Sequence, residues 1–285
     1  MAHDVIDVNE ALLRSWPLPV PDGSKRSRGD ILVVGGARAT PGAAQLAGLS
    51  ALRVGAGRLT LAVAASVAQK VAVAVPESGV LALDETAEGH VRGRSVRSFA
   101  TELRGADALL VGPGLDEIGE ARRMLAALSD VVRGAQPVVL DAYALGALAT
   151  RRAGNPFANA IMKPNESEAE VLLARPLREL VDDTVELARR YGAVVSCMGV
   201  VADAEGTAYR VYEAGPGLGT SGSGDVLAGA ITGLAGRGCP ALQAAVWGTY
   251  LHAAAGKTLA AELAPIGYLA RDLSARLPAE LGAVT

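Results

Sequence analysis

Short apolar runs alternate along this chain with longer runs in which alanine and leucine recur at helical spacing. A short apolar run that ends in glycine is typical of a buried strand and its turn, and a longer amphipathic run is typical of a helix. A helix is expected over Pro41–Gly57, and the chain looks helical from Val226 almost to its end. The same pattern predicts strands at Ile31–Gly36, Arg58–Val63, Ala108–Gly114, Gly192–Gly199 and Thr207–Ala214, with strand-to-helix units at Pro137–Leu148 and Ala160–Ala174.

Strands that alternate with helices predict an α/β protein. Its parallel βαβ units should form one open, mostly parallel sheet that helices cover on both faces. No change in composition and no repeat divides the sequence, so residues 24–285 are expected to form a single domain. Residues 1–23 should hold a short helix near Val8–Trp16 and a proline-rich linker. Because ligands bind beyond the carboxyl ends of such strands, we expect the turns there to line one crevice.

Composition and charge exclude several partners. Half of the 285 residues are hydrophobic, 20% are charged, and the net charge is −3. This balance gives no field that would attract nucleic acid or an anionic membrane, and the basic run Lys25–Arg28 is too short for a nucleic-acid-binding arm. The N-terminus lacks the apolar core of a secretory signal, and no uncharged apolar run is long enough to span a membrane. With two cysteines, Cys197 and Cys239, the sequence predicts a soluble cytoplasmic protein.

The most informative stretch is GPGLGTSGSGDVLAGAITG, residues 215–233. Gly217, Gly219 and Gly222 fit the glycine spacing of a dinucleotide-binding fingerprint, but residues 226–261 contain no acidic residue for the ribose. Residues 255–258 (AGKT) resemble the end of a phosphate-binding P-loop that lacks its first glycine. The three histidines, at positions 3, 90 and 252, have no metal-ligand spacing. His252 is expected to pack within a helix, and no structural metal site is indicated.

What remains is a glycine loop that leads into a helix, with Asp225 at the junction. Free N–H groups and the helix dipole form a site suited to phosphate. A carboxylate beside a phosphate is unfavourable unless it has a chemical role, and in phosphoryl transfer an aspartate deprotonates the attacking hydroxyl. The alternative is that Asp225 only caps the helix. The loop alone leaves both interpretations open.

Further motifs resemble those of a known family. GSGD resembles the signature of the ribokinase-like superfamily, in which the aspartate is the catalytic base. GARATPGAAQLAGLSALRVGAG, GPGL (112–115), VLDAYAL (139–145), YLHAAAG and GYLARDLSARLP resemble segments of ADP/ATP-dependent NAD(P)H-hydrate dehydratases. The resemblance covers residues 24–278. It implies a ribokinase-like fold and a lyase that repairs hydrated NADH and NADPH (NADHX and NADPHX). In this reaction ADP or ATP phosphorylates the extra ring hydroxyl, and phosphate is then eliminated.

The resemblance also implies roles for particular residues. Asp225 would be the catalytic base and contact the substrate, while Ala44, Gly114 and Asn165 would also contact the hydrated nicotinamide nucleotide. The transferred phosphate would lie against Gly222, Ser223 and Gly224. Mg²⁺ would neutralise the donor phosphates, and members of the family commonly form homo-oligomers, often tetramers. Asp141, at the end of a predicted strand, could face the same crevice, although capping of the next helix is the expectation.

Three positions depart from the family pattern. Asn165 stands where the family has a histidine, and Met198 stands where it has a lysine near the nucleotide phosphates. Lys163 is a candidate replacement for that lysine, and Arg28, in place of a tyrosine, is a further candidate phosphate contact. The departures leave two alternatives to the dehydratase: a small-molecule kinase that transfers phosphate without elimination, and a homologue that binds nucleotide but has lost catalysis.

Overall fold

The computed structural model describes residues 4–20, 23–151, 154–212 and 215–285. Within these residues ten strands form one sheet in the order β1-β10-β9-β8-β7-β6-β5-β2-β3-β4. The strands are β1 Val5–Asp7, β2 Asp30–Val34, β3 Arg58–Ala64, β4 Ser78–Leu83, β5 Ala108–Val111, β6 Val138–Leu140, β7 Ala160–Met162, β8 Val194–Cys197, β9 Val200–Ala202 and β10 Ala208–Arg210.

Neighbouring strands run parallel, except that β9 is antiparallel to both β8 and β10. The predicted mostly parallel sheet is therefore confirmed. The strand predicted at 207–214 is shorter than expected, and its residues 213–214 lie outside the described residues. β1, β4 and β9 have no counterpart among the predicted strands.

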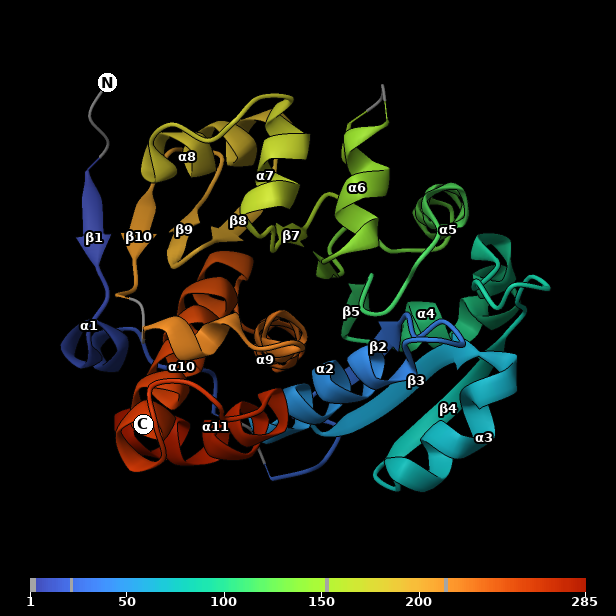
Figure 1. Ribbon diagram of the computed structural model, residues 1–285, viewed down its shortest axis with the longest axis horizontal. Helices are drawn as coiled ribbons and strands as arrows, with labels where there is room; N and C mark the ends of the chain where they lie inside the picture. The colour runs from blue at the N-terminus through green and yellow to red at the C-terminus, as the bar shows by residue number, and fades with distance from the viewer. Residues whose placement is uncertain (1–3, 21–22, 152–153, 213–214) are drawn as a thin grey trace.

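Helices cover both faces of the sheet, as the alternating pattern predicts. Figure 1 shows α5, α6, α7 and α8 along one face and α2, α9, α10 and α11 along the other. Among the described residues, no helix is both long enough and apolar enough to cross a bilayer. The helices are α1 Glu10–Ser15, α2 Pro41–Arg53, α3 Ala65–Ala74, α4 Ala100–Gly105, α5 Ile118–Ser129, α6 Tyr143–Ala149, α7 Glu166–Leu173, α8 Leu180–Tyr191, α9 Ser223–Gly236, α10 Ala241–Glu262 and α11 Ala270–Val284, with 3₁₀ turns η1 Gly93–Phe99 and η2 Pro216–Gly219.

The first helix and strand pack against the rest of the fold. β1 pairs with β10, and the Trp16 ring stacks on Tyr209 with 5.8 Å between ring centroids. The indole N–H of Trp247, a fully buried residue of α10, donates to the Trp16 carbonyl at 3.0 Å. The boundary between residues 23 and 24 stays a prediction, and residues 1–3 and 21–22 lie outside the described residues.

The path of the chain through the sheet reverses direction at the pair β5–β2. From β2 the chain proceeds to β3 and β4, and then returns so that β5 pairs with the other side of β2. At such a switch point, the loops that follow the two central strands diverge and leave a crevice beyond their carboxyl ends. Here the turns after β2 and β5 are tied together, because Gly36 N–H donates to the Pro113 carbonyl at 2.8 Å.

Candidate active site

Close packing of α2 against α9 brings their first turns together. An added Cβ on Gly229 would lie 2.0 Å from the Ala47 carbonyl oxygen, and one on Gly233 would lie 2.5 Å from that of Ala51. Both pairs are four residues apart along each helix, so the helices run parallel with their N-termini side by side. Glycine is needed at these positions because any side chain would push the helices apart. Asp225 therefore lies beside the start of α2.

Gly114 lies against the first turn of α2. Its φ is +72°, and an added Cβ would lie 2.3 Å from the Thr40 carbonyl oxygen and 3.2 Å from the Ala43 Cβ. The Thr40 hydroxyl donates to the Gly114 carbonyl at 2.9 Å. Ala44, which follows Ala43 in the first turn of α2, has no exposed surface. The structure thus places Gly114, Ala44 and Asp225 in one region, while the substrate contacts assigned to them stay predictions.

The glycine loop presents two backbone N–H groups at the start of α9. Gly222 is the N-cap with φ 88°, a left-handed conformation that favours glycine, and no side chain caps the helix. The Ser223 N–H donates to the Thr220 carbonyl at 3.1 Å. Among the described residues, no hydrogen bond involves the N–H of Gly224 or Asp225. These two donors and the helix dipole suit an anion. The phosphate contact assigned to Gly222, Ser223 and Gly224 stays a prediction.

Asp225 does not cap α9, so that alternative is wrong. It stands in the first helical turn, after the N-cap Gly222. Burial raises the pKa of its carboxyl to about 6, Asp141 and Glu168 raise it as well, and Lys163 opposes the shift. A carboxyl with this pKa is mostly ionised at neutral pH and still binds a proton readily, as a general base requires.

Lys163 and Asp141 form a buried ion pair beside Asp225. Lys163 Nζ lies 3.0 Å from Asp141 Oδ1, and the two side chains are 9% and 5% exposed. Asp141 Oδ1 also accepts from the Ala142 N–H at 2.9 Å, and no side chain caps α6. The expected capping role of Asp141 is therefore wrong. Adjacent parallel strands β6 and β7 end side by side, so the residues that follow them, Asp141 and Lys163, meet at this edge.

Ser223 is linked to His252, a contact that sequence reasoning missed. Ser223 Oγ lies 2.9 Å from His252 Nε2, and both residues are buried. Burial, with a further contribution from Lys163, lowers the pKa of His252 to about 4, so the imidazole is neutral near pH 7. His252 does lie within a helix, as predicted. No local pattern connects it with Ser223, because the two are brought together only by the packing of α9 against α10.

A cavity of about 220 Å³ opens on the β7–β8 side of Asp225. Its lining includes Lys163, Asn165, Met198, Ser223 and His252. Apolar side chains such as Leu218 and Leu227 complete the walls, and Met198 is 43% exposed with φ 47°. A lining that combines polar groups with apolar walls suits a nucleotide, whose phosphates are charged and whose base is largely apolar.

Asn165 caps α7. Asn165 Oδ1 accepts from the Glu168 N–H at 2.9 Å, while the Glu168 carboxylate accepts from the Asn165 N–H at 3.0 Å. The Ser167 hydroxyl also donates to Asn165 Oδ1 at 2.9 Å. The cap therefore occupies the side-chain oxygen, and the amide NH₂ is the group that remains for a ligand. The substrate contact assigned to Asn165 stays a prediction.

Arg28 is not a phosphate contact, contrary to the sequence-based expectation. Its neighbour Gly29 packs on the carboxyl end of α9, where an added Cβ would lie 2.1 Å from the Gly236 carbonyl oxygen. Asp225 is eleven residues earlier in the same helix, which corresponds to about 16 Å at 1.5 Å per residue. Arg28 precedes β2 and therefore lies at the amino edge of the sheet, whereas the crevice lies beyond its carboxyl edge.

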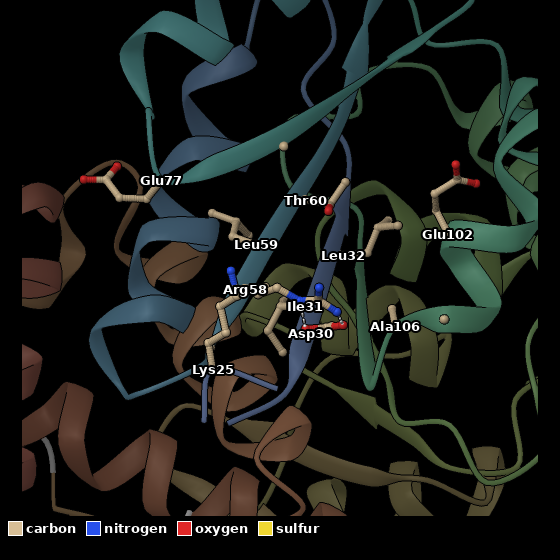
Figure 2. A pocket seen from close by; sticks show the side chains of 13 residues that line it. Lys25, Asp30, Ile31, Leu32, Arg58, Leu59, Thr60, Glu77, Glu102 and Ala106 are labelled. Carbon is tan, nitrogen blue, oxygen red and sulfur yellow. Dashed lines mark hydrogen bonds and ion pairs between the residues drawn. The ribbon is translucent and has the colours of Figure 1, made fainter. Parts of the chain in front are cut away.

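The amino edge has a separate pocket of about 610 Å³, shown in Figure 2. Asp30 and Arg58, at the starts of β2 and β3, form an ion pair inside it. Glu77 and Glu102 lie on its rim (Figure 2). Its size exceeds that of the cavity beside Asp225, but it contains none of the residues predicted to act in catalysis. The described residues also contain no group of three or more His, Cys, Asp or Glu side chains able to hold a metal ion.

The sheet order and the helix-borne aspartate beyond its carboxyl edge define a ribokinase-like protein. A ribokinase-like superfamily protein of Enterococcus faecalis has the same fold, with a TM-score of 0.86 at 20% identity over 99% of this chain and 96% of that one. The ADP/ATP-dependent NAD(P)H-hydrate dehydratase of Bacillus subtilis, co-crystallised with ATP and Mg²⁺, gives a TM-score of 0.83 at 25% identity and full coverage of both chains.

Sequence comparison identifies the family. A model of the NAD(P)H-hydrate dehydratase family matches residues 31–279. The ADP-dependent (S)-NAD(P)H-hydrate dehydratase of Xanthomonas campestris is 41% identical over 280 residues, 95% of this chain and 94% of that protein. The bifunctional NAD(P)H-hydrate repair enzyme of Moorella thermoacetica is 35% identical, and the match covers half of its length. This chain belongs to the NAD(P)H-hydrate dehydratase family, which confirms the resemblance found in its motifs.

Proposed function

We propose that this protein dehydrates hydrated NADH and NADPH at the expense of ADP or ATP. The observation that carries the proposal is the position of Asp225, a proton-accepting carboxylate between the glycine loop and the Gly114 turn. The 41% identical relative, named as an ADP-dependent dehydratase, supports the same reaction. Donor nucleotide would occupy the cavity beside Met198 and His252, and the hydrated nicotinamide would lie on the Gly114 side.

In the proposed first step, Asp225 removes the proton of the ring hydroxyl. The resulting oxygen attacks the terminal phosphorus of the donor, and the bond from that phosphorus to the remaining nucleotide breaks. The N–H groups of Gly224 and Asp225, at the positive end of the α9 dipole, would bind the phosphoryl oxygens as charge moves between them. In the second step the ring C–O bond breaks, and loss of phosphate and a neighbouring ring proton restores the double bond.

Mg²⁺ fits this site as an ion bound to the nucleotide phosphates rather than as an ion coordinated by protein side chains. The nearby carboxylate of Asp141 is already paired with the Lys163 ammonium. Mg²⁺ commonly binds through substrate phosphates and water with few protein ligands, and it would neutralise donor charge here. Assembly into a homo-oligomer, as a tetramer by family resemblance, and residence in the cytoplasm remain part of the proposal.

The test is turnover of hydrated NADH and NADPH with ADP or ATP and Mg²⁺. We expect the absorbance of the reduced cofactor to return together with free phosphate, and we expect Asp225→Asn to abolish both. Asp130→Asn is the matched control, because Asp130 pairs with Arg97 on the surface and both side chains are more than half exposed. Phosphorylated product without elimination would identify the kinase alternative. Nucleotide binding without turnover, unchanged in Asp225→Asn, would identify the homologue that has lost catalysis.

A further inference from the structure

The ammonium group of Lys163 lies at the first turn of α9. An added Cβ on Gly224, the second residue of that helix, would lie 3.0 Å from Lys163 Nζ. Glycine at this position therefore leaves room for the lysine beside the free N–H groups of the anion site. The same ammonium lines the 220 Å³ cavity together with Ser223 and Gly224. Lys163 thus faces both the proposed donor site and the point of transfer.

The surroundings keep Lys163 charged. Burial alone would lower its pKa, but the carboxylates of Asp141, Glu168 and Asp225 outweigh burial and raise it. An ammonium has three N–H donors, and the ion pair with Asp141 uses one of them. No described residue accepts a hydrogen bond from the other two. Because a buried charge with unused donors is costly, the arrangement favours an anionic ligand at this point.

Asp141 fixes the position of the lysine. Its carboxylate is held by the Ala142 N–H at 2.9 Å, and it binds Lys163 Nζ at 3.0 Å. A long, flexible lysine side chain is thereby restricted to one place next to Gly224. Met198, which stands in the position of the family lysine, lines the same cavity but carries no charge. Lys163 is the one Lys or Arg among the described residues that line this cavity.

We propose that Lys163 binds the phosphoryl group in transit and that Asp141 positions it for this task. The inference rests on the proposed function and adds a catalytic residue to it. As the bond from the ring oxygen to phosphorus forms and the bond to the leaving nucleotide breaks, Lys163 neutralises the phosphoryl oxygens from the side opposite the ring. The ring proton goes to Asp225, and Lys163 keeps its own proton throughout.

Binding of ADP and AMP tests this without turnover. AMP lacks the terminal phosphoryl group that Lys163 would contact, so the wild type should bind ADP more tightly than AMP in calorimetry with Mg²⁺. Lys163→Met should reduce the ratio of the two affinities by about 10- to 100-fold, as expected for loss of a charged hydrogen bond. Lys70→Met, which removes an exposed lysine of α3, is the matched control and should leave the ratio unchanged.

Lys163→Met leaves the Asp141 carboxylate buried without a cation to pair with and can fail to fold for that reason. The double variant Lys163→Met/Asp141→Asn removes both charges and should show the same loss of discrimination. A wild type that binds ADP and AMP equally, or a double variant with an unchanged ratio, overturns the proposal. If the wild type binds ADP but does not turn over hydrated NADH, the proposed function fails while the binding ratio still decides the role of Lys163.

Kinetics supply a readout that a structural role would not change. Lys163→Met should lower kcat by about 10²- to 10³-fold, the usual loss when one group that stabilises transition-state charge is removed. Lys163 lowers and Asp141 raises the pKa of Asp225. The acid limb of kcat/KM should therefore move to higher pH in Lys163→Met and to lower pH in Asp141→Asn. Shifts in the same direction, or no shift in either variant, would contradict the proposal.

Discussion

Asp225→Asn should make the protein more stable while it removes activity. The carboxyl has a pKa of about 6 in the folded protein against 3.8 ordinarily, because burial disfavours its charged form. One pKa unit corresponds to 1.36 kcal/mol, so ionised Asp225 costs the folded state about 3 kcal/mol. Asparagine has nearly the same shape and carries no charge. Near pH 7 the variant should gain up to this amount of unfolding free energy.

The pH dependence of this gain follows from the direction of the shift. A carboxyl whose folded pKa is raised stabilises the protein while it is protonated, and that stability is lost as the pH rises from about 4 through about 6. The wild type loses this stability over that pH range, and Asp225→Asn does not. The difference between them should be close to zero below about pH 4 and complete above about pH 7.

Urea unfolding of both proteins at several pH values measures the difference directly, with ligand absent throughout. Asp130→Asn, on the exposed surface, should track the wild type at every pH. A variant that is less stable than the wild type at pH 7 would show that Asp225 makes a favourable contact in the folded state. A gain of equal size at pH 4 and pH 7 would refute the argument as well, because it would not arise from ionisation.

Three further experiments test the packing that builds the site. Gly222→Ala should lower both the unfolding free energy, by about 1–3 kcal/mol, and the affinity for nucleotide, because the residue has φ 88° and an added Cβ would lie 2.7 Å from Leu46 Cδ1. Urea unfolding measures the first effect and calorimetry the second. Gly229→Ala should lower the unfolding free energy measured with urea by about 3 kcal/mol or more, because an added Cβ would lie 2.0 Å from the Ala47 carbonyl oxygen. Gly282→Ala is the control: this glycine of α11 faces open space, so the substitution should be neutral or stabilising. Ser223→Ala and His252→Phe, alone and combined, should show a coupling of about 1–3 kcal/mol in a double-mutant cycle of unfolding free energies. Additive effects would mean that the 2.9 Å contact between the two side chains does not contribute to stability as a hydrogen bond.

Several features of the fold could be predicted from the sequence because their cause is local. A run such as ILVVGG is apolar throughout, so it identifies a strand buried on both faces, and β2 lies where it predicts. Asn165 followed by Glu168 is a capping box whose partners are three residues apart. In contrast, β1 has only three residues, and its pairing partner β10 is about 200 residues away. No local pattern identifies such a strand.

The candidate site likewise has one part that local sequence predicts and another that only packing creates. The glycines and Asp225 lie within about ten residues of one another, so their combination indicated phosphate chemistry. Whether Asp225 caps the helix depended on where α9 begins, and the left-handed N-cap at Gly222 decided it. Arg28 was misjudged because it was chosen by its place in the family motif, although a residue that precedes a strand lies at the amino edge of the sheet, away from the crevice. Its neighbour lies at the far end of α9.

The sequence by itself determined the alternation of the central strands with helices, the glycine loop and the acid that follows it, because spacing and residue type act over a few positions. Only the tertiary structure decided which side chains share the crevice. Asp141 and Lys163 meet because β6 and β7 are adjacent and parallel, and Ser223 meets His252 because α9 packs on α10. The raised pKa of Asp225 has the same origin. Burial and the charges of neighbouring side chains exist only once distant segments of the chain have packed together.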